Sequence, residues 1–370
     1  MPRHAPGRRD EHADFGPDFP GRAPRRPRRR WWLSLPSPIL AIAVLVFVVL
    51  PVVWPETEDV GAAPSSRGDF KLAADVTAVA VTPDGGRAAA TGRDRPVVVW
   101  QKGEDQAWSM RSLPEHMPTG SRCLAAAADG RTLAAGNVDG SVSLWDMASG
   151  ERRASLAGGT EMVLSLAFSP DGRTLASAGG DTKVRIWDVA SAGPRATLDL
   201  RGAPATSLSF GPDGRQLACG CEDGIVRVWG DVGRPDAAPL TFVASQQVVL
   251  AVAFSPDGRS LASASLCGRG IDVWNVPEQR SRGFLPTRGF SATCLGFTPD
   301  GLHLIAGEDD GTLGSWNALS LSRQAEFPAH SGWVKALAVA QGAPAVLTGG
   351  NDGYVRRWDL VEVLSGRPRR

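Results

Sequence analysis

Short runs of apolar residues recur along this chain, and many alternate with polar residues before ending at a tryptophan. Val184-Arg185-Ile186-Trp187 and Val226-Arg227-Val228-Trp229 are examples. A period of two predicts β-strands with one buried face. The closing tryptophans recur at intervals of 42 or 45 residues: Trp100, Trp145, Trp187, Trp229, Trp274, Trp316 and Trp358. This regularity predicts seven copies of one structural unit.

Two further markers keep a nearly fixed distance from each tryptophan. Six units have an aspartate six residues before it: Asp94, Asp139, Asp181, Asp223, Asp310 and Asp352. The fifth unit has Gly268 there and one extra residue in its turn. Five units carry Pro-Asp-Gly further upstream, starting at Pro83, Pro170, Pro212, Pro256 and Pro299. Proline presets φ and glycine tolerates the exit, so each motif predicts a tight turn.

Between these markers each unit accommodates four short antiparallel strands, which we name a to d in chain order. In unit three we expect them at residues 163–168, 173–178, 183–187 and 195–200. Four strands about every 42 residues is the period of a propeller blade.

Aligned positions of strand a alternate in size. The central position is large: Val79, Leu124, Leu166, Leu208, Val252, Leu295 and Leu337. The residue before it is small: Ala78, Cys123, Ser165, Ser207, Ala251, Cys294 and Ala336. The residue after it is also small: Ala80, Ala125, Ala167, Ser209, Ala253, Gly296 and Ala338. Blades that pack face to face need this alternation, because large side chains of one sheet fit where the next has little volume.

These features resemble the WD-repeat family, named for the Trp-Asp dipeptides that stand here at residues 145–146, 187–188 and 358–359. The resemblance covers about Asp69 to Leu360 and implies an all-β, seven-bladed propeller of four-stranded antiparallel blades. Such rings close when an N-terminal strand completes the last blade. We therefore expect Phe70 and Leu72 to pair outside the strand that ends at Trp358.

The N-terminal region differs from the repeats. Residues 1–30 contain nine arginines and are predicted to be a disordered cytoplasmic tail. Residues 31–55 carry no charge, have tryptophans at both ends and are predicted to form one transmembrane α-helix. The arginines keep the N-terminus in the cytoplasm, so a linker (56–68), the propeller (69–360) and a C-terminal tail (361–370) follow outside it. A cleaved signal peptide is the alternative for the apolar segment.

Composition narrows the function classes. The net charge of +1 indicates no nucleic-acid partner, and the Gly-, Ala- and Arg-rich composition is typical of a bacterium with a GC-rich genome. No phosphate-binding loop, zinc-protease or serine-hydrolase motif occurs, so we expect no enzyme activity and no cofactor. Five cysteines form no disulfide framework, and Cys219 and Cys221 are expected to pack in strand b and bind no metal.

One polar constellation stands out in unit seven. His330, Thr348, Asp352 and Trp358 occupy positions that in WD-repeat proteins form a buried hydrogen-bonded chain bracing the blade. The same residue types also suit a nucleophile relay. The resemblance favours the bracing role because the repeat places all four residues inside the blade.

The remaining function class is surface recognition. In WD-repeat proteins the loops before strand a and between strands b and c form one rim of the ring, a common docking face. Aromatic and arginine residues dominate binding energies at interfaces. Our candidate contacts to a protein or peptide partner are Trp333, Arg93, Arg122, Glu222, Asp309 and Met162. The expected function is a membrane-tethered, non-catalytic scaffold; a channel-based enzyme or ligand binder and a cytoplasmic regulatory module are the alternatives.

Overall fold

The computed structural model describes residues 69–368 except 73–74, 94, 115–119 and 160. The predicted tail, transmembrane segment and linker, and also Asp94, lie outside the described residues. Among the residues that are described, no helix is both long and apolar enough to span a bilayer.

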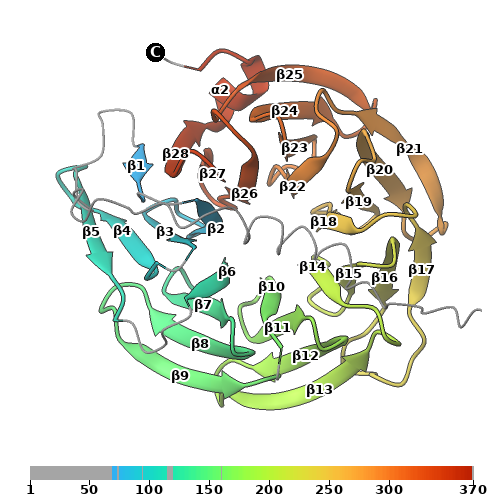
Figure 1. The fold of residues 1–370 in the computed structure, drawn as a ribbon, viewed down its shortest axis with the longest axis horizontal. Coiled ribbons are helices and arrows are strands. Elements are labelled where there is room, and N and C mark those ends of the chain that lie inside the picture. The colour runs from blue at the N-terminus through green and yellow to red at the C-terminus, as the bar shows by residue number, and fades with distance from the viewer. Residues whose placement is uncertain (1–68, 73–74, 94, 115–119, 160, 369–370) are drawn as a thin grey trace, which may run out of the picture. The chain divides into compact units, whose positions relative to one another are not determined.

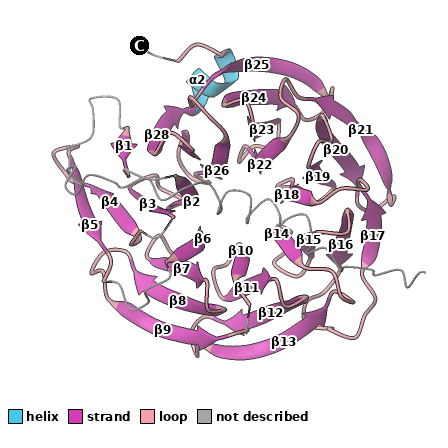
Figure 2. Ribbon diagram, in the orientation of Figure 1, coloured by secondary structure: helices cyan, strands magenta, loops and turns pink. Residues whose placement is uncertain are grey.

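The described residues form seven four-stranded antiparallel sheets arranged as blades around a central channel (Figure 1). Strands make up nearly all of the regular structure (Figure 2). Blades 1 to 3 consist of β2 (Val76–Val81), β3 (Arg87–Gly92), β4 (Val98–Lys102), β5 (Trp108–Ser112); β6 (Ser121–Ala126), β7 (Thr132–Asn137), β8 (Ser141–Asp146), β9 (Arg152–Ala157); and β10 (Val163–Phe168), β11 (Thr174–Gly179), β12 (Lys183–Asp188), β13 (Gly193–Asp199).

Blades 4 to 6 repeat the same order. They consist of β14 (Ala205–Phe210), β15 (Leu217–Cys221), β16 (Ile225–Trp229), β17 (Leu240–Val243); β18 (Val249–Phe254), β19 (Ser260–Ser265), β20 (Gly270–Asn275), β21 (Arg280–Pro286); and β22 (Ala292–Phe297), β23 (His303–Glu308), β24 (Thr312–Asn317), β25 (Ser322–Pro328). The seven-bladed prediction is therefore confirmed. In unit three, strand a matches its predicted bounds, whereas strand b begins one residue later and strand d two residues earlier than predicted.

Blade 7 takes its fourth strand from the N-terminal side of the ring. It consists of β26 (Val334–Val339), β27 (Ala345–Gly350), β28 (Tyr354–Asp359) and β1 (Phe70–Lys71). Phe70 pairs with Val355, and the amide of Leu72 donates to the carbonyl of Gly353 at 2.8 Å. The predicted closure is confirmed.

The hydrophobic core lies between the blades. The described residues form seven buried clusters, and each cluster draws side chains from two neighbouring blades. Each repeat tryptophan packs toward the preceding blade, where three of them meet a phenylalanine of strand d. Ring centroids are 4.6 Å apart for Phe70–Trp100, 5.2 Å for Phe242–Trp274 and 5.0 Å for Phe327–Trp358. Phe70 thus gives blade 7 the aromatic contact that blades 4 and 6 make with a phenylalanine of their own strand d.

The small residues of strand a also form hydrogen bonds between blades. The hydroxyls of Ser165 and Ser207 accept the amides of Leu208 and Val252, each on the next blade, at 2.9 and 3.0 Å. The thiol of Cys123 donates toward the carbonyl of Val163 at 3.5 Å. Cys123 is buried as expected, whereas Cys294 is only half-buried. These positions are therefore restricted by hydrogen bonding as well as by volume.

The aspartate of the Trp-Asp dipeptide shapes the turn between strands c and d. Asp146 Oδ1 accepts the amides of Ala148 and Ser149 at 2.9 and 3.1 Å. Asn317, which departs from the dipeptide, accepts the amides of Leu319 and Ser320 in the same way. Asparagine can replace aspartate here because the turn requires an acceptor oxygen but does not require a negative charge.

The C-terminal tail begins with a short helix, α2 (Leu360–Ser365), which the sequence did not predict. Asp359, the last Trp-Asp aspartate, is its N-cap and accepts the amide of Val361 at 2.8 Å. Val363 is buried beside Phe327 and Trp358 in the cluster between blades 6 and 7. The helix therefore adds a second contact across the closing blades.

We predict that Phe70→Ala lowers the free energy of unfolding by about 3–5 kcal/mol, because it removes a buried ring between the first and last blades. Urea denaturation followed by tryptophan fluorescence measures this change. Phe284→Ala is the control, because Phe284 also lies on an outer strand but is half exposed. Equal effects of the two substitutions would show that β1 does not seal the ring.

Candidate partner-binding face

One end of the ring carries the loops that precede strand a and the turns between strands b and c; we call it the entry face. In each of five blades, a backbone hydrogen bond joins two loop positions: the entry residue, which directly precedes strand a, and the residue before the aspartate of the b–c turn. The amide of the residue before the turn aspartate donates to the carbonyl of the entry residue: Arg93 to Asp75, Gly180 to Met162, Glu222 to Pro204, Asp309 to Ser291 and Asn351 to Trp333. The two loops of each of these blades therefore form one continuous surface.

The six candidate contacts differ in exposure. Trp333 is exposed, with 41% of its surface accessible. The other five are half-buried: Arg93, Arg122, Met162, Glu222 and Asp309. Asp309 also has a local role, because its Oδ1 accepts the amide of Phe290 at 3.0 Å. Trp333 is thus the candidate that is best placed to meet a partner.

The extra residue in unit five shifts the predicted rim position. Leu266, and not Cys267, donates its amide to the entry residue Val248, at 2.8 Å. Cys267 instead donates to the hydroxyl of Ser291 on blade 6, at 2.9 Å. The insertion therefore carries Cys267, the residue before Gly268, towards the neighbouring blade, and Leu266 occupies the rim position of unit five.

The same insertion builds a contact that the sequence analysis missed. The amide of Arg269 donates to the carbonyl of Phe290 at 2.9 Å, and its guanidinium carbon lies 5.7 Å from the centre of the Phe290 ring. Phe290 is 63% exposed. The broken spacing of unit five was a signal that this part of the rim differs from the others. Phe290 and Trp333 therefore place exposed aromatic rings on the entry loops of adjacent blades.

The structure brings the four residues of the unit-seven constellation together. His330 Nδ1 lies 2.8 Å from Asp352 Oδ1, and His330 Nε2 lies 2.8 Å from Thr348 Oγ1. The indole of Trp358 donates to the same hydroxyl at 2.8 Å. The Thr348 hydroxyl thus links the indole to the imidazole, and His330 Nδ1 faces both Asp352 Oδ1 and the Arg356 guanidinium. This hydrogen-bonded chain holds strands β27 and β28 and the entry loop together.

An arginine that the sequence analysis missed completes this chain. Arg356 Nη1 lies 2.7 Å from Asp352 Oδ2. The same aspartate–arginine spacing recurs in Asp181–Arg185 and Asp223–Arg227, both at 2.6 Å. Burial lowers the pKa of His330 because it disfavours the charged ring. Hydrogen bonds from His330 and Arg356 outweigh burial and lower the pKa of Asp352 to about 2. The brace therefore contains a neutral histidine and an ionised aspartate.

Blade 6 achieves the same bracing with different residues. Glu308 is fully buried and accepts the amides of Arg288 and Gly289 at 2.6 and 2.8 Å, which ties the entry loop to β23. Arg323 donates to Glu308 at 2.7 Å and lies over the ring of Trp316. Burial raises the pKa of Glu308, while these partners oppose the shift.

At the centre of the ring, the second half of strand a in each blade and the turns after it line a cavity of about 720 Å³, which is one part of the central channel. Its described lining is apolar apart from Ser169, Ser209, Ser255 and Gln341, and it includes no ionisable side chain. Within the described part of the chain, no three His, Cys, Asp or Glu residues gather in a way that suits a metal ion.

Seven blades built on a repeating turn, aspartate and tryptophan define a WD-repeat β-propeller. Residues 110–359 match the family model described as the IFT122 first beta-propeller, which covers more than half of the chain. The chain belongs to this family.

Several named proteins share shorter stretches with the chain. A p21-activated protein kinase-interacting protein 1-like from Xenopus laevis is 32% identical over 92 residues, which span 25% of this chain and 25% of that protein. A WD repeat-containing protein 3 homolog from Dictyostelium discoideum is 29% identical over 118 residues, or 32% of this chain and 12% of that protein. Myosin heavy chain kinase C from Dictyostelium discoideum is 34% identical over 74 residues, or 20% of this chain and 9% of that protein. Each match thus spans a quarter or less of the relative's own length.

We predict that acid weakens the blade-7 brace. The pKa of His330 is lower in the folded state than in the unfolded state. The contribution of His330 to the free energy of unfolding is therefore complete above about pH 6.5 and is lost as the pH falls through the folded-state pKa. His330→Gln should therefore cost about 1–3 kcal/mol at pH 7.5 and progressively less towards pH 5, measured by urea denaturation. His303→Gln is the control for a histidine outside the brace. A His330→Gln cost that stays constant from pH 7.5 to pH 5 would contradict this assignment.

Proposed function

We propose that this protein is a non-catalytic scaffold that presents the entry face of its propeller to a protein or peptide partner. The supporting observation is the pair of exposed rings, Phe290 and Trp333, on the entry loops of adjacent blades. Aromatic side chains supply large contact areas at little entropic cost, and arginine adds charge-assisted contacts. Arg269, which lies over Phe290, meets this description. The apolar lining of the channel supports a non-catalytic role.

The proposal includes a membrane tether. The uncharged segment 31–55 is long enough to cross a bilayer, and the nine arginines before it favour a cytoplasmic N-terminus. The linker of residues 56–68 then holds the propeller near the outer surface of the membrane. Bacterial origin and uncleaved anchoring belong to the same proposal.

The contact surface is tested by site-specific photo-crosslinking in cells. A benzoylphenylalanine introduced at Phe290 or Trp333 should crosslink a partner. Position 319 is the matched control, because Leu319 is 68% exposed but lies in the turn between strands c and d, at the opposite end of the ring. Crosslinks to the same partner from position 319 and none from 290 or 333 would place the docking surface elsewhere.

Topology is tested separately by adding protease to intact cells. On the proposed orientation the propeller is digested while a cytoplasmic control protein survives. A propeller that becomes sensitive only after lysis would favour the cytoplasmic regulatory module. Purified protein whose N-terminus maps near Ala63 would indicate a cleaved signal peptide in place of the anchor.

A further inference from the structure

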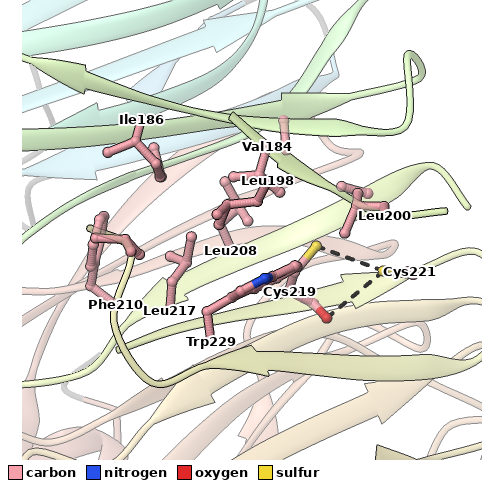
Figure 3. Packing of buried hydrophobic residues seen from close by; sticks show 14 of the residues in the cluster. Val184, Ile186, Leu198, Leu200, Leu208, Phe210, Leu217, Cys219, Cys221 and Trp229 are labelled. Carbon is pink, nitrogen blue, oxygen red and sulfur yellow. Dashed lines mark hydrogen bonds between the residues drawn. The ribbon is translucent and has the colours of Figure 1, made fainter. Parts of the chain in front are cut away.

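Two cysteines of blade 4 lie in direct contact inside the ring. Cys219 and Cys221 are separated by one glycine on β15, so both side chains point to the same face of the sheet. Their sulfur atoms are 3.7 Å apart, and both residues are fully buried. Figure 3 shows them beside Leu200 and Trp229 in the cluster between blades 3 and 4. This is a preformed pair of thiols.

The two thiols have different surroundings. Arg227 is the register partner of Cys219 on β16, and its guanidinium is held by two hydrogen bonds to Asp223, at 3.1 and 2.6 Å. The hydrogen bond from Cys219 lowers the pKa of Cys221, burial opposes the shift, and the charge of Arg227 reinforces it. Burial raises the pKa of Cys219. One sulfur is therefore suited to be the thiolate and the other the proton donor.

The solitary buried thiol of Cys123 provides a contrast. Its sulfur atom lies 3.5 Å from the carbonyl oxygen of Val163. Burial raises the pKa of Cys123 to about 12. Burial thus disfavours the thiolate of a solitary cysteine, whereas the neighbouring Cys219 sulfur and Arg227 favour the thiolate of Cys221.

We propose that Cys219 and Cys221 form a redox-reactive dithiol that a hydroperoxide oxidises to a reversible disulfide within strand β15. The Cys221 thiolate attacks the terminal oxygen of the peroxide and the O–O bond breaks, which forms a sulfenic acid and releases hydroxide from hydrogen peroxide or an alkoxide from an organic hydroperoxide. The Cys219 sulfur then attacks the sulfenic sulfur, the S–O bond breaks, and the oxygen leaves as water with the Cys219 proton. The two sulfurs lose two electrons in total, and the peroxide gains them.

Strand geometry makes this disulfide strained. Residues two apart on a strand have Cα atoms about 6.7 Å apart, near the upper limit of the distance that a disulfide spans. Closing the bond requires β15 to bend at Gly220, a glycine that is packed so closely that a Cβ there would lie 2.7 Å from Val249. Strained disulfides are readily reduced. Oxidation should therefore loosen the packing of blade 4 against both of its neighbours, blades 3 and 5, and a thiol reductant should restore it.

Burial determines how the reaction proceeds. Cys221 is the last residue of β15, and the exposed turn residue Asp223 follows it closely. Peroxide reaches the sulfur when this turn opens. The oxidation rate should therefore increase in urea concentrations that are too low to unfold the protein.

The test uses the full chain carrying Cys267→Ser, which removes the one exposed thiol. After hydrogen peroxide treatment, the protein is quenched, unfolded, alkylated with iodoacetamide and analysed by peptide mass spectrometry. We expect Cys219 and Cys221 to lose alkylation together, to form an unalkylated peptide lighter by two hydrogens, and to regain both labels after reduction. Cys123 and Cys294 should stay alkylatable throughout.

Cys219→Ser in the same background is the mechanistic control. Cys221 should then stop at the sulfenic acid, which dimedone labels, and no disulfide should form. Two results would overturn the proposal: alkylation of both cysteines after a peroxide dose that oxidises Cys267 of the unmodified chain, or oxidation of all four buried or half-buried thiols at one rate. Neither result needs the Cys219→Ser protein, because the unmodified chain sets the peroxide dose and the Cys267→Ser protein gives the readout, so the test stands even if Cys219→Ser does not fold.

Discussion

The packing of each blade against the blade before it is the constraint on which the rest of this structure depends. All seven buried clusters of the described residues bridge two blades. A sheet of four short strands has little stability unless one face is covered. Six of the seven repeat tryptophans are buried in these clusters, and Trp274 is half-buried. Each blade covers a face of one neighbour and is itself covered by the other, so the ring is stable only when it is closed. The N-terminal strand β1 and the C-terminal helix α2 both contribute to this closure.

This constraint also separates the positions of each unit whose side chains are restricted by packing from the positions whose side chains can vary. Strand a is limited by volume and by hydrogen bonds between blades, as Ser165 and Ser207 illustrate. In five blades a backbone hydrogen bond joins the residue just before strand a to the b–c turn, and any residue except proline can donate its amide. Side chains at the exposed loop positions, such as Phe290 and Trp333, lie outside the buried clusters and can therefore differ between blades. An insertion such as that of unit five therefore changes the surface by placing Arg269 against Phe290 and leaves the blade intact.

The sequence predicted the blade number, the closing strand and the composition of the unit-seven brace because each follows from a pattern in fixed register. It missed Phe290 and Arg269 because an insertion interrupts that register. It missed Arg356 because strand arginines usually face solvent, and only the fold shows that this one reaches Asp352. Helix α2 was missed because six residues are too short for a periodic pattern; its signal was the capping box formed by Asp359 and Glu362.

The pairing of β1 with β28 determines when the ring can close during synthesis of the chain. Phe70 is synthesised before blade 1, whereas its partner Val355 lies in β28 and is synthesised only after six blades are complete. Until then, blade 1 shows an uncovered tryptophan and the growing array has two open sheet edges. Contacts between such distant parts of a chain form slowly. The nascent protein therefore stays an open array that is prone to self-association until β28 has been synthesised and closes the ring.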